Sequence, residues 1–353
     1  MIMKKNTLPL LLFILLLGCS GQKKTVTVPV PSIFDFTSTI NLEGLKADLS
    51  VLSHDSLEGR NTGSEGEAKA AKFLAQRYAT LGLEPVGDND TYFQGFKLAR
   101  ASEVKTNNVV AFLEGSDPVK KEEVIVLSAH YDHLGISQPD STGDAIYNGA
   151  DDNGSGTIAL LHIAQAMVAA QKAGAGPKRS VLFLHVSAEE LGLLGSRYYS
   201  ENPIFPIENT VANLNADMIG GRDQQNTESG DYIYIIGGSI ISSDVDSLVN
   251  LANQESVNIN LSDRYNDLSD PLQLYRRSDH WNFGRLGIPF IFFFSGLHDN
   301  YHQPSDEIDK IDFDALTKRS QLIFTTAAKI ANADERPEVD NQAFIEITQL
   351  EPR

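Results

Sequence analysis

Apolar positions recur along this chain with two different spacings. Over 62–82 they fall three or four residues apart, as on one face of a helix, with Thr62 or Ser64 as the cap and Gly82 as the stop. Short apolar runs elsewhere indicate strands. The pattern predicts strands at 108–113, 124–127, 181–186, 211–216, 232–236 and 288–294, and helices at 155–171, 244–258 and 313–333.

The order of these elements predicts the fold class. The run at 124–127 is apolar at every position, as expected of a strand buried on both faces of a sheet. Strands alternate with helices along the chain, which favours crossover connections and parallel pairing. We therefore predict an α/β protein, a three-layer sandwich with a central mixed, mostly parallel sheet.

The first 19 residues have the features of an export signal. Lys4 and Lys5 precede an apolar run over 8–17 that is too short to span a bilayer comfortably. The run closes on Leu-Leu-Gly-Cys at Cys19, which resembles the lipobox of bacterial lipoproteins. This resemblance implies cleavage and lipid attachment at Cys19. The alternative is an ordinary secretory signal with an incidental cysteine.

One domain is expected after this signal. Residues 20–35 are rich in polar residues and proline, which predicts a tether, and 36–335 contain no linker-like break. Residues 336–353 are expected to be a C-terminal tail. No later segment is apolar over 18 residues, so we expect no transmembrane helix. The protein would lie in the bacterial cell envelope, on the periplasmic side or the cell surface, attached to the membrane through lipidated Cys19.

Charge and cysteine content narrow the partners and the chemistry. The 353 residues include 47 acidic and 29 basic side chains, and the net charge of −18 argues against nucleic acid or an anionic membrane face as the main partner. Cys19 is the only cysteine. The mature chain would therefore have neither disulfides nor thiolate metal ligands.

Side chains that bind metals follow four of the predicted strands. Open α/β sheets bind ligands outside the carboxyl ends of their strands. Acidic residues between apolar runs, such as Glu189 and Glu190, are usually paired or metal-bound. The side chains at these strand ends are His130, Asp132, His133, Glu189, Glu190, Asp217, His298, Asp299, Tyr301 and His302.

Asp151 and Asp152 precede the predicted helix at 155–171. They could form a turn in which Asn153 or Ser155 caps the helix, or one of them could bind a cation. Without cysteine the metal ligands must be nitrogen and oxygen atoms, which suits zinc and also cobalt or manganese. Five ligands with one of them bridging would suit two ions better than one.

Several of these segments, in this order, resemble motifs of a known family. The segment 128–135 resembles the His-x-Asp motif of the M28 metallopeptidases, a family of co-catalytic di-zinc aminopeptidases. Over about residues 40–335 the resemblance implies a zinc-exopeptidase-like fold. The other matching segments are 148–156 for the bridging aspartate, 188–192 for the paired glutamates, 215–220 for a further aspartate, 278–280, 301–306 for the final histidine, and 55–60 with 62–64 upstream.

The resemblance implies two zinc ions, with cobalt or manganese as alternatives. His130 and Asp217 would bind one ion, and Glu190 and His302 the other. Asp152 would bridge both ions.

The resemblance also implies three further roles. Asp132 would orient the imidazole of His130. Glu189 would be the general base, which takes a proton from a metal-bridging water and passes it to the leaving amine. Tyr301 resembles the tyrosine that hydrogen-bonds the developing oxyanion in some members. The implied reaction is the release of N-terminal amino acids from peptides with a free N-terminus.

Three other activities remain as alternatives on this scaffold. Glutaminyl cyclases resemble these peptidases but use a single zinc and lack part of the ligand set, whereas this sequence has all of it. Receptors of the same superfamily have lost metal ligands. A carboxypeptidase or dipeptidase would share the whole centre and differ only in the pocket walls.

The chain lacks one feature that secreted relatives often have. Only 99–121 precede the strand before His130, which is too short for a protease-associated insertion. His54, His162 and His185 are expected to be surface or packed imidazoles. His133 and His298 lie near the predicted site but have no ligand counterpart in the family.

Overall fold

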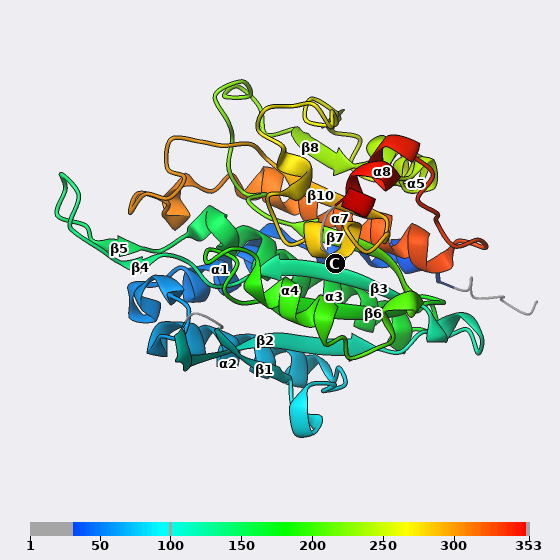
Figure 1. The fold of residues 1–353 in the computed structure, drawn as a ribbon, viewed down its shortest axis with the longest axis horizontal. Helices are drawn as coiled ribbons and strands as arrows, with labels where there is room; N and C mark the ends of the chain where they lie inside the picture. Colours follow the sequence, from blue (N-terminus) through cyan, green and yellow to red (C-terminus); the bar gives the residue numbers. More distant parts are fainter. Residues whose placement is uncertain (1–30, 99–100, 351–353) are drawn as a thin grey trace, which may run out of the picture. The chain divides into compact units, whose positions relative to one another are not determined.

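The computed structural model describes residues 31–98 and 101–350, which are built around one mixed sheet (Figure 1). The strand order is β1-β2-β6-β3-β7-β10-β8-β9. The strands are β1 (Phe93–Leu98), β2 (Ala101–Leu113), β3 (Val124–His130), β6 (Ser180–Val186), β7 (Thr210–Ala216), β8 (Tyr232–Gly237), β9 (Asn260–Ser262) and β10 (Phe290–Phe294).

Parallel pairing is concentrated at the centre of this sheet. β6, β3, β7 and β10 run parallel to one another, and antiparallel β2 and β8 flank them. At the edges, β1 pairs antiparallel with β2 and β9 pairs parallel with β8. Because the four central strands share a direction, their carboxyl ends lie at one edge of the sheet. The mixed, mostly parallel sheet predicted from the sequence is confirmed.

Helices cover both faces of the sheet, which gives the predicted three layers. On one face, alternate strand residues such as Ile125 and Phe183 pack against α1, α2, α3, α5 and α7. On the other, Val126, Leu184 and Phe292 belong to clusters with residues of α4, α6 and α8. The helices are α1 (Leu42–Leu52), α2 (Glu65–Leu81), α3 (Gly156–Lys172), α4 (Leu194–Glu201), α5 (Ser243–Glu255), α6 (Trp281–Gly284), α7 (Phe313–Asn332) and α8 (Gln342–Leu350).

Local capping explains where two of the predicted helices begin and end. The side chain of Ser64 accepts a hydrogen bond from the backbone N–H of Glu67, so Ser64 rather than Thr62 caps α2. Gly82 ends that helix with a φ of 81°, in the left-handed region that glycine adopts without strain. At the start of α3, the side chain of Asn153 accepts from the backbone N–H of Gly156.

The two ends of the expected domain differ from the sequence prediction. Ile33 is buried at the start of a 3-10 helix, Ile33–Thr39, so the last part of the predicted tether packs on the domain. Residues 336–350 are not an open tail, because Phe344 of α8 is fully buried and packs edge-on against Trp281 and Phe290. A short helix with one buried aromatic gives too weak a periodic signal to be recognised in sequence.

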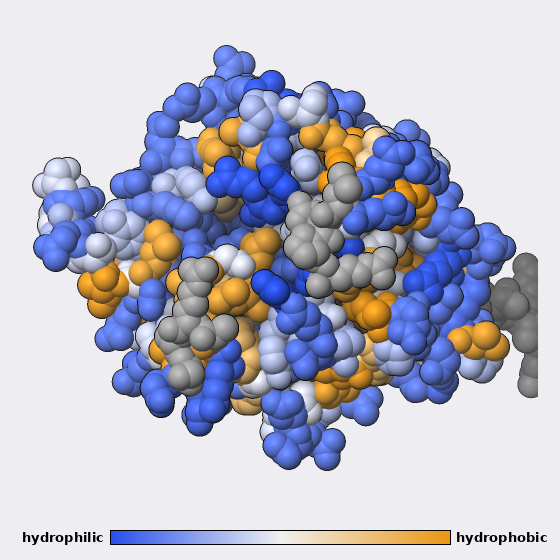
Figure 2. Space-filling view, viewed as in Figure 1, coloured by the Kyte–Doolittle hydropathy of each residue, from blue (hydrophilic) through white to orange (hydrophobic). Residues whose placement is uncertain are grey.

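The surface seen in Figure 2 is largely hydrophilic, in keeping with the many acidic residues of the sequence. On the face shown in Figure 2, hydrophobic residues form separated patches among hydrophilic ones. A hairpin of β4 (Gly135–Ile136) and β5 (Ile146–Tyr147) extends from the body at the left of Figure 1. None of the helices in the described residues has the length and apolar character needed to cross a bilayer.

Candidate metal centre

The carboxyl ends of the central strands bring the predicted ligands together. His130 is the last residue of β3, and Asp217 directly follows β7. Glu190 lies in the loop after β6, and His302 lies in the loop after β10. Asp152 lies in the turn Ala150–Ser155 that leads into α3, and its peptide bond to Asn153 is cis.

The first cluster, here the His130 group, consists of His130, Asp152 and Asp217. The Nε2 atom of His130 lies 3.2 Å from Oδ1 of Asp152 and 3.4 Å from Oδ1 of Asp217. The three side chains can offer ligand atoms that lie within 4.8 Å of one another. All three are buried, so nearly all of this cluster is shielded from water.

The second cluster, here the His302 group, consists of His302, Asp152 and Glu190. The Nε2 atom of His302 lies 3.1 Å from Oδ2 of Asp152 and 3.2 Å from Oε2 of Glu190. The two carboxylate oxygens of Asp152 therefore point to different clusters. This is the arrangement that a bridging carboxylate needs, and the sequence assigned that role to Asp152.

His133 joins the second cluster from the side. Its Nδ1 atom lies 2.8 Å from Oε1 of Glu190 and 3.9 Å from Oδ2 of Asp152. The side chain is fully buried, and its ring meets that of His302 edge-on. The sequence placed His133 near the site without a role. In the structure His133, Asp152 and Glu190 can offer ligand atoms that lie within 4.8 Å of one another, and the contact of His133 with Glu190 orients that carboxylate.

The donor set fits divalent cations. All candidate ligand atoms are imidazole nitrogens or carboxylate oxygens, which suits zinc, cobalt or manganese. The buried Oδ1 atom of Asp217 and Nε2 atom of His133 have no hydrogen-bond partner. Among the described residues, no lysine or arginine forms an ion pair with Asp152, Glu190 or Asp217. Buried carboxylates without a basic partner are stabilised by metal ions.

The electrostatics of the two clusters follow from these contacts. Burial alone would raise the pKa of Asp152, but the bonds to His130 and His302 hold it well below its usual value. Burial opposes protonation of His302, yet the carboxylates of Asp152 and Glu190 raise its pKa to about 10. Each of these histidines thus faces carboxylates that could also bind a cation.

Asp132 lies beside His130, as predicted, but with a different contact. The Nδ1 atom of His130 is 3.2 Å from the backbone oxygen of Asp132 and 3.7 Å from its carboxylate. The carboxylate accepts hydrogen bonds from the hydroxyl of Thr62 and the backbone N–H of Glu189. Asp132 therefore connects the predicted ligand His130 to the predicted general base Glu189.

Arg60 is a supporting residue that sequence reasoning missed. Its guanidinium is fully buried and donates to the backbone oxygens of Tyr131, Asn148 and Gly149, at 2.8, 2.6 and 3.0 Å. These carbonyls flank His130 on one side and the Asp152 turn on the other. The upstream segment 55–60, which resembled secreted members of the family, thus holds two ligand-bearing loops together.

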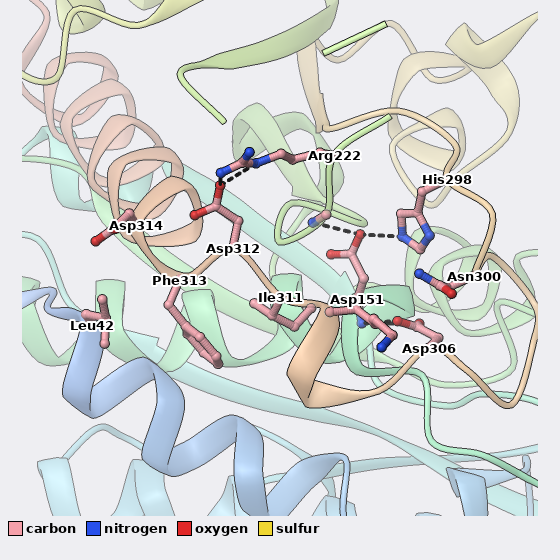
Figure 3. A pocket seen from close by; sticks show the side chains of 12 residues that line it. Leu42, Asp151, Arg222, His298, Asn300, Asp306, Ile311, Asp312, Phe313 and Asp314 are labelled. Atoms are coloured by element: carbon pink, nitrogen blue, oxygen red, sulfur yellow. Dashed lines mark hydrogen bonds and ion pairs between the residues drawn. The ribbon is translucent and has the colours of Figure 1, made fainter. Parts of the chain in front are cut away.

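Asp151 and Asp306 lie close together in the wall of a second cavity (Figure 3), and both bond to groups of the Asp152 turn or its neighbours. Asp306 accepts from the backbone N–H groups of Asp151 and Asp152, each at 3.0 Å. Asp151 accepts from the backbone N–H of Gly220 and from His298, at 2.6 and 2.9 Å. Asp151 and His298 line a cavity of about 440 Å³, and among the described residues neither side chain forms an ion pair or hydrogen bond with a side chain of the two clusters. His298 is therefore a support of the turn.

Glu189 lies at the same edge but outside both clusters. Burial and the neighbouring carboxylates of Asp279 and Asp217 raise its pKa well above the usual value, against the opposing charge of His130. Asp279 accepts a hydrogen bond from Ser196 at 2.5 Å. Its neighbour Ser278 donates to Asp217 at 2.7 Å. The motif 278–280, to which the sequence gave no role, therefore lies beside the predicted base Glu189 and the predicted ligand Asp217.

Backbone strain marks the same edge of the sheet. Ala188, Met218 and His302 have φ values of 58°, 52° and 56°, which side chains other than glycine rarely adopt. Such strained conformations persist only where the surrounding structure holds the backbone in place, and they are common at functional sites. Gly149, with a φ of 53°, is required sterically, because a Cβ there would lie 2.2 Å from the backbone oxygen of Asp152.

A cavity opens next to the two clusters. The predicted ligands His130, Asp152, Asp217 and His302 line one side of it, together with Glu189. Tyr301 also lines it, and its ring stacks on that of His302 at 3.8 Å between centroids. The remaining walls are Met218, Leu274, Phe292, Phe294, Leu297 and Arg277.

The remaining predicted packed histidines lie away from this cavity. His185 is fully buried and bonds to the hydroxyl of Tyr78 at 2.6 Å, and burial lowers its pKa to about 3. His162 pairs with Asp48 at 3.0 Å. His54 caps the 3-10 helix Asp55–Arg60.

Comparison with known proteins assigns the family. The sequence model of Peptidase family M28 matches residues 108–327. That stretch is more than half of the chain and contains all five predicted ligands, so the chain belongs to peptidase family M28.

Relatives and solved structures agree with this assignment. A probable leucine aminopeptidase of Arthroderma otae is 29% identical over 222 residues, which cover 62% of this chain and 57% of the relative. The chain thus matches less than two thirds of that relative's length.

Among solved structures, LapB from Legionella pneumophila has a TM-score of 0.65 at 18% identity and covers 86% of this chain and 77% of its own. BSAP, a zinc aminopeptidase from Bacillus subtilis, has a TM-score of 0.64 at 15% identity and covers 88% of this chain and 99% of its own. A glutaminyl cyclase from Bacteroides thetaiotaomicron has a TM-score of 0.59 at 18% identity, with 84% and 98% coverage. At these identities the likeness concerns the fold alone.

Proposed function

We propose that this protein is a metal-dependent aminopeptidase that releases N-terminal amino acids from peptides. The observation that carries the proposal is the divided carboxylate of Asp152, with one oxygen near His130 and the other near His302. Two divalent ions held there would polarise the scissile carbonyl and lower the pKa of a bound water. Zinc is the first choice, since the donors are nitrogen and oxygen atoms.

The protein's own groups have distinct tasks in this reaction. The His130 group would hold one ion and the His302 group the other, with Asp152 in both. Glu189 accepts the proton of the attacking water and delivers it to the leaving amine. Asp132 bonds to the backbone N–H of Glu189 and so keeps the base in place. The hydroxyl of Tyr301 donates a hydrogen bond to the oxygen of the tetrahedral intermediate.

The walls of the cavity suggest which N-terminal residues are accepted. Met218, Leu274, Phe292 and Phe294 are buried and apolar beside the clusters. An apolar side chain that packs against these walls is removed from water, which favours binding, and no polar group is buried with it. Leucine, methionine and phenylalanine are therefore the expected N-terminal residues.

The glutaminyl cyclase alternative is less well supported. Such an enzyme would need only one ion, whereas both clusters are complete in this chain. The shared fold of the Bacteroides cyclase does not distinguish the two activities, because function depends on the site.

A chelation experiment tests the proposal. The purified chain should hydrolyse leucine p-nitroanilide, lose this activity in a chelator and regain it with zinc or cobalt. An N-acetylated leucine anilide should not be cleaved, because an aminopeptidase requires the free amine. Full activity in the chelator would refute metal dependence, and equal cleavage of the blocked substrate would refute aminopeptidase activity.

Attachment to a membrane through Cys19 is a further part of the proposal, and this residue lies outside the described ones. The support is the apolar run over 8–17 that ends at Cys19. Cys19→Ser should move the protein from the membrane fraction to the soluble fraction of the cell envelope. Continued membrane association of the variant would contradict lipid attachment.

A further inference from the structure

Arg277 lines the cavity beside the two clusters together with apolar, acidic, histidine and tyrosine side chains. Among the described residues that line the cavity beside the two clusters, it is the sole lysine or arginine. Its side chain is exposed to solvent, whereas the apolar walls Phe292 and Phe294 are buried. Arg277 therefore lies at the rim of the cavity and the apolar residues form its interior.

The guanidinium of Arg277 has no partner within the described part of the chain, in either hydrogen bonds or ion pairs. Other arginines of this domain are engaged: Arg179 pairs with Glu123, Arg222 pairs with Asp312, and Arg319 donates to four backbone oxygens. An unpaired arginine on an open surface is ordinary, because water solvates it. At the rim of a substrate cavity, the same free donors are available to a ligand.

The backbone at Arg277 is fixed relative to the metal ligands. The backbone N–H of Arg277 bonds to the oxygen of Leu274 at the end of a 3-10 helix, Leu274–Arg276. The next residue, Ser278, donates to Asp217 at 2.7 Å and accepts from Asn215 at 2.9 Å. The backbone of Arg277 therefore has a defined position, one residue before Ser278, which bonds to Asp217 of the His130 group.

We propose that Arg277 binds the C-terminal carboxylate of short peptides and so makes this enzyme favour dipeptides. The inference rests on the proposed aminopeptidase function. A guanidinium pairs with a carboxylate through two parallel hydrogen bonds, which a solvated lysine does not reproduce. In a dipeptide this carboxylate lies one residue beyond the scissile bond, on the side that leaves the cavity.

An acidic N-terminal side chain is a less suitable partner for Arg277. Such a side chain would have to enter between Met218, Phe292 and Phe294, where a carboxylate loses its hydration without compensation. It would also approach the carboxylates of Glu189 and Asp217. The C-terminal carboxylate of the leaving part avoids both costs, since it remains at the exposed rim.

The test compares Leu-Gly with Leu-Gly amide, which differ only in the terminal charge. The full-length, zinc-loaded protein should show a kcat/KM ratio of acid to amide of about ten, the value expected for a hydrogen bond to a charged group. Arg277→Met should bring this ratio close to one, and Arg277→Lys should retain part of it. The matched control Arg197→Met removes an exposed arginine that pairs with Glu201 on α4, and should leave the ratio as in the unmodified protein.

The outcomes separate this inference from the proposed function. A wild-type ratio near one, or an unchanged ratio in Arg277→Met, would overturn the role of Arg277. Arg277→Met could instead lower the activity on aspartyl anilide and leave the ratio for the Leu-Gly pair unchanged. This result would also overturn the role, and it would indicate that Arg277 recognises an acidic N-terminal side chain. Failure of the zinc-loaded wild type to cleave any of these substrates would instead refute the aminopeptidase function itself.

Discussion

The His130 group and the His302 group share Asp152 but are held in different ways. His130 and Asp217 belong to the ends of β3 and β7, neighbouring strands of the sheet, and their side chains are 1% and 11% exposed. Glu190 and His302 belong to loops, and the side chain of His302 is 34% exposed. One cluster is thus built on the sheet and the other on connections that follow it.

This difference predicts unequal metal binding. β3 and β7 lie inside the sheet with a hydrogen-bonded strand on each side, so His130 and Asp217 should be in place before an ion arrives. The His302 group depends on side-chain supports, namely His133 against Glu190 and the ring of Tyr301 against His302. We therefore expect the ion of the His130 group to bind more tightly and the ion of the His302 group to be lost first during dialysis.

The largest effect is expected from Asp152→Asn, which removes the residue common to both clusters. An amide keeps the shape of the side chain but supplies no bridging negative charge. Both ions should be lost, and anilide hydrolysis should fall to the level of the metal-free protein. Metal content measured by mass spectrometry is the direct readout.

Asp309→Asn is the matched control, because Asp309 is exposed and, within residues 31–98 and 101–350, pairs only with the adjacent Lys310. It should keep the metal content and the activity of the wild type. Two tightly bound ions in Asp152→Asn would show that the two ions do not share this carboxylate.

The next effect is that of Glu189→Gln, which should leave both clusters intact. Loss of the base should lower kcat by about 10²–10⁴-fold. Metal content should stay at the wild-type level, since Glu189 contacts neither cluster. Glu190→Gln should instead lower the metal content. The reverse pattern would mean that Glu190 is the base and Glu189 the ligand.

The smallest effect concerns the supports of the two clusters. His133→Ala should weaken binding of one ion by about 10–100-fold, because mutation of such supporting groups has effects of this size. The lost contact is the bond to Glu190, which no strand holds in place. Competition with a zinc indicator, titrated against each variant, measures the change.

Ser278→Ala is the counterpart in the His130 group, where it removes the hydroxyl that donates to Asp217. Asp217 directly follows β7 and stays in position without that bond. The loss of affinity should therefore be smaller than in His133→Ala and should affect the tighter ion. Equal losses in the two variants would show that the sheet adds nothing to the stability of its cluster.

The elements that sequence predicted best are those with long, uniform patterns. The strands β3, β6 and β7 and the helices α2, α3 and α7 lie where the apolar spacing placed them, within a few residues. The strand expected at 288–294 begins only at Phe290, because the backbone N–H of Ile288 bonds back to Phe283 at the end of α6. Helix α1, the strands β1, β4, β5 and β9 and the short helices α4, α6 and α8 were missed. The short elements among them depend on contacts from distant segments.

The sequence by itself determined which residues could form the metal centre and at which strand ends they would lie. Residue type and strand direction suffice for that, because parallel strands deliver their following residues to one edge. Only the tertiary structure decided how those residues are supported. Arg60 reaches carbonyls 71 to 89 positions away in sequence, and His133 turns toward Glu190 across the edge of the sheet. Such contacts depend on where loops cross in space, and no local pattern encodes that crossing.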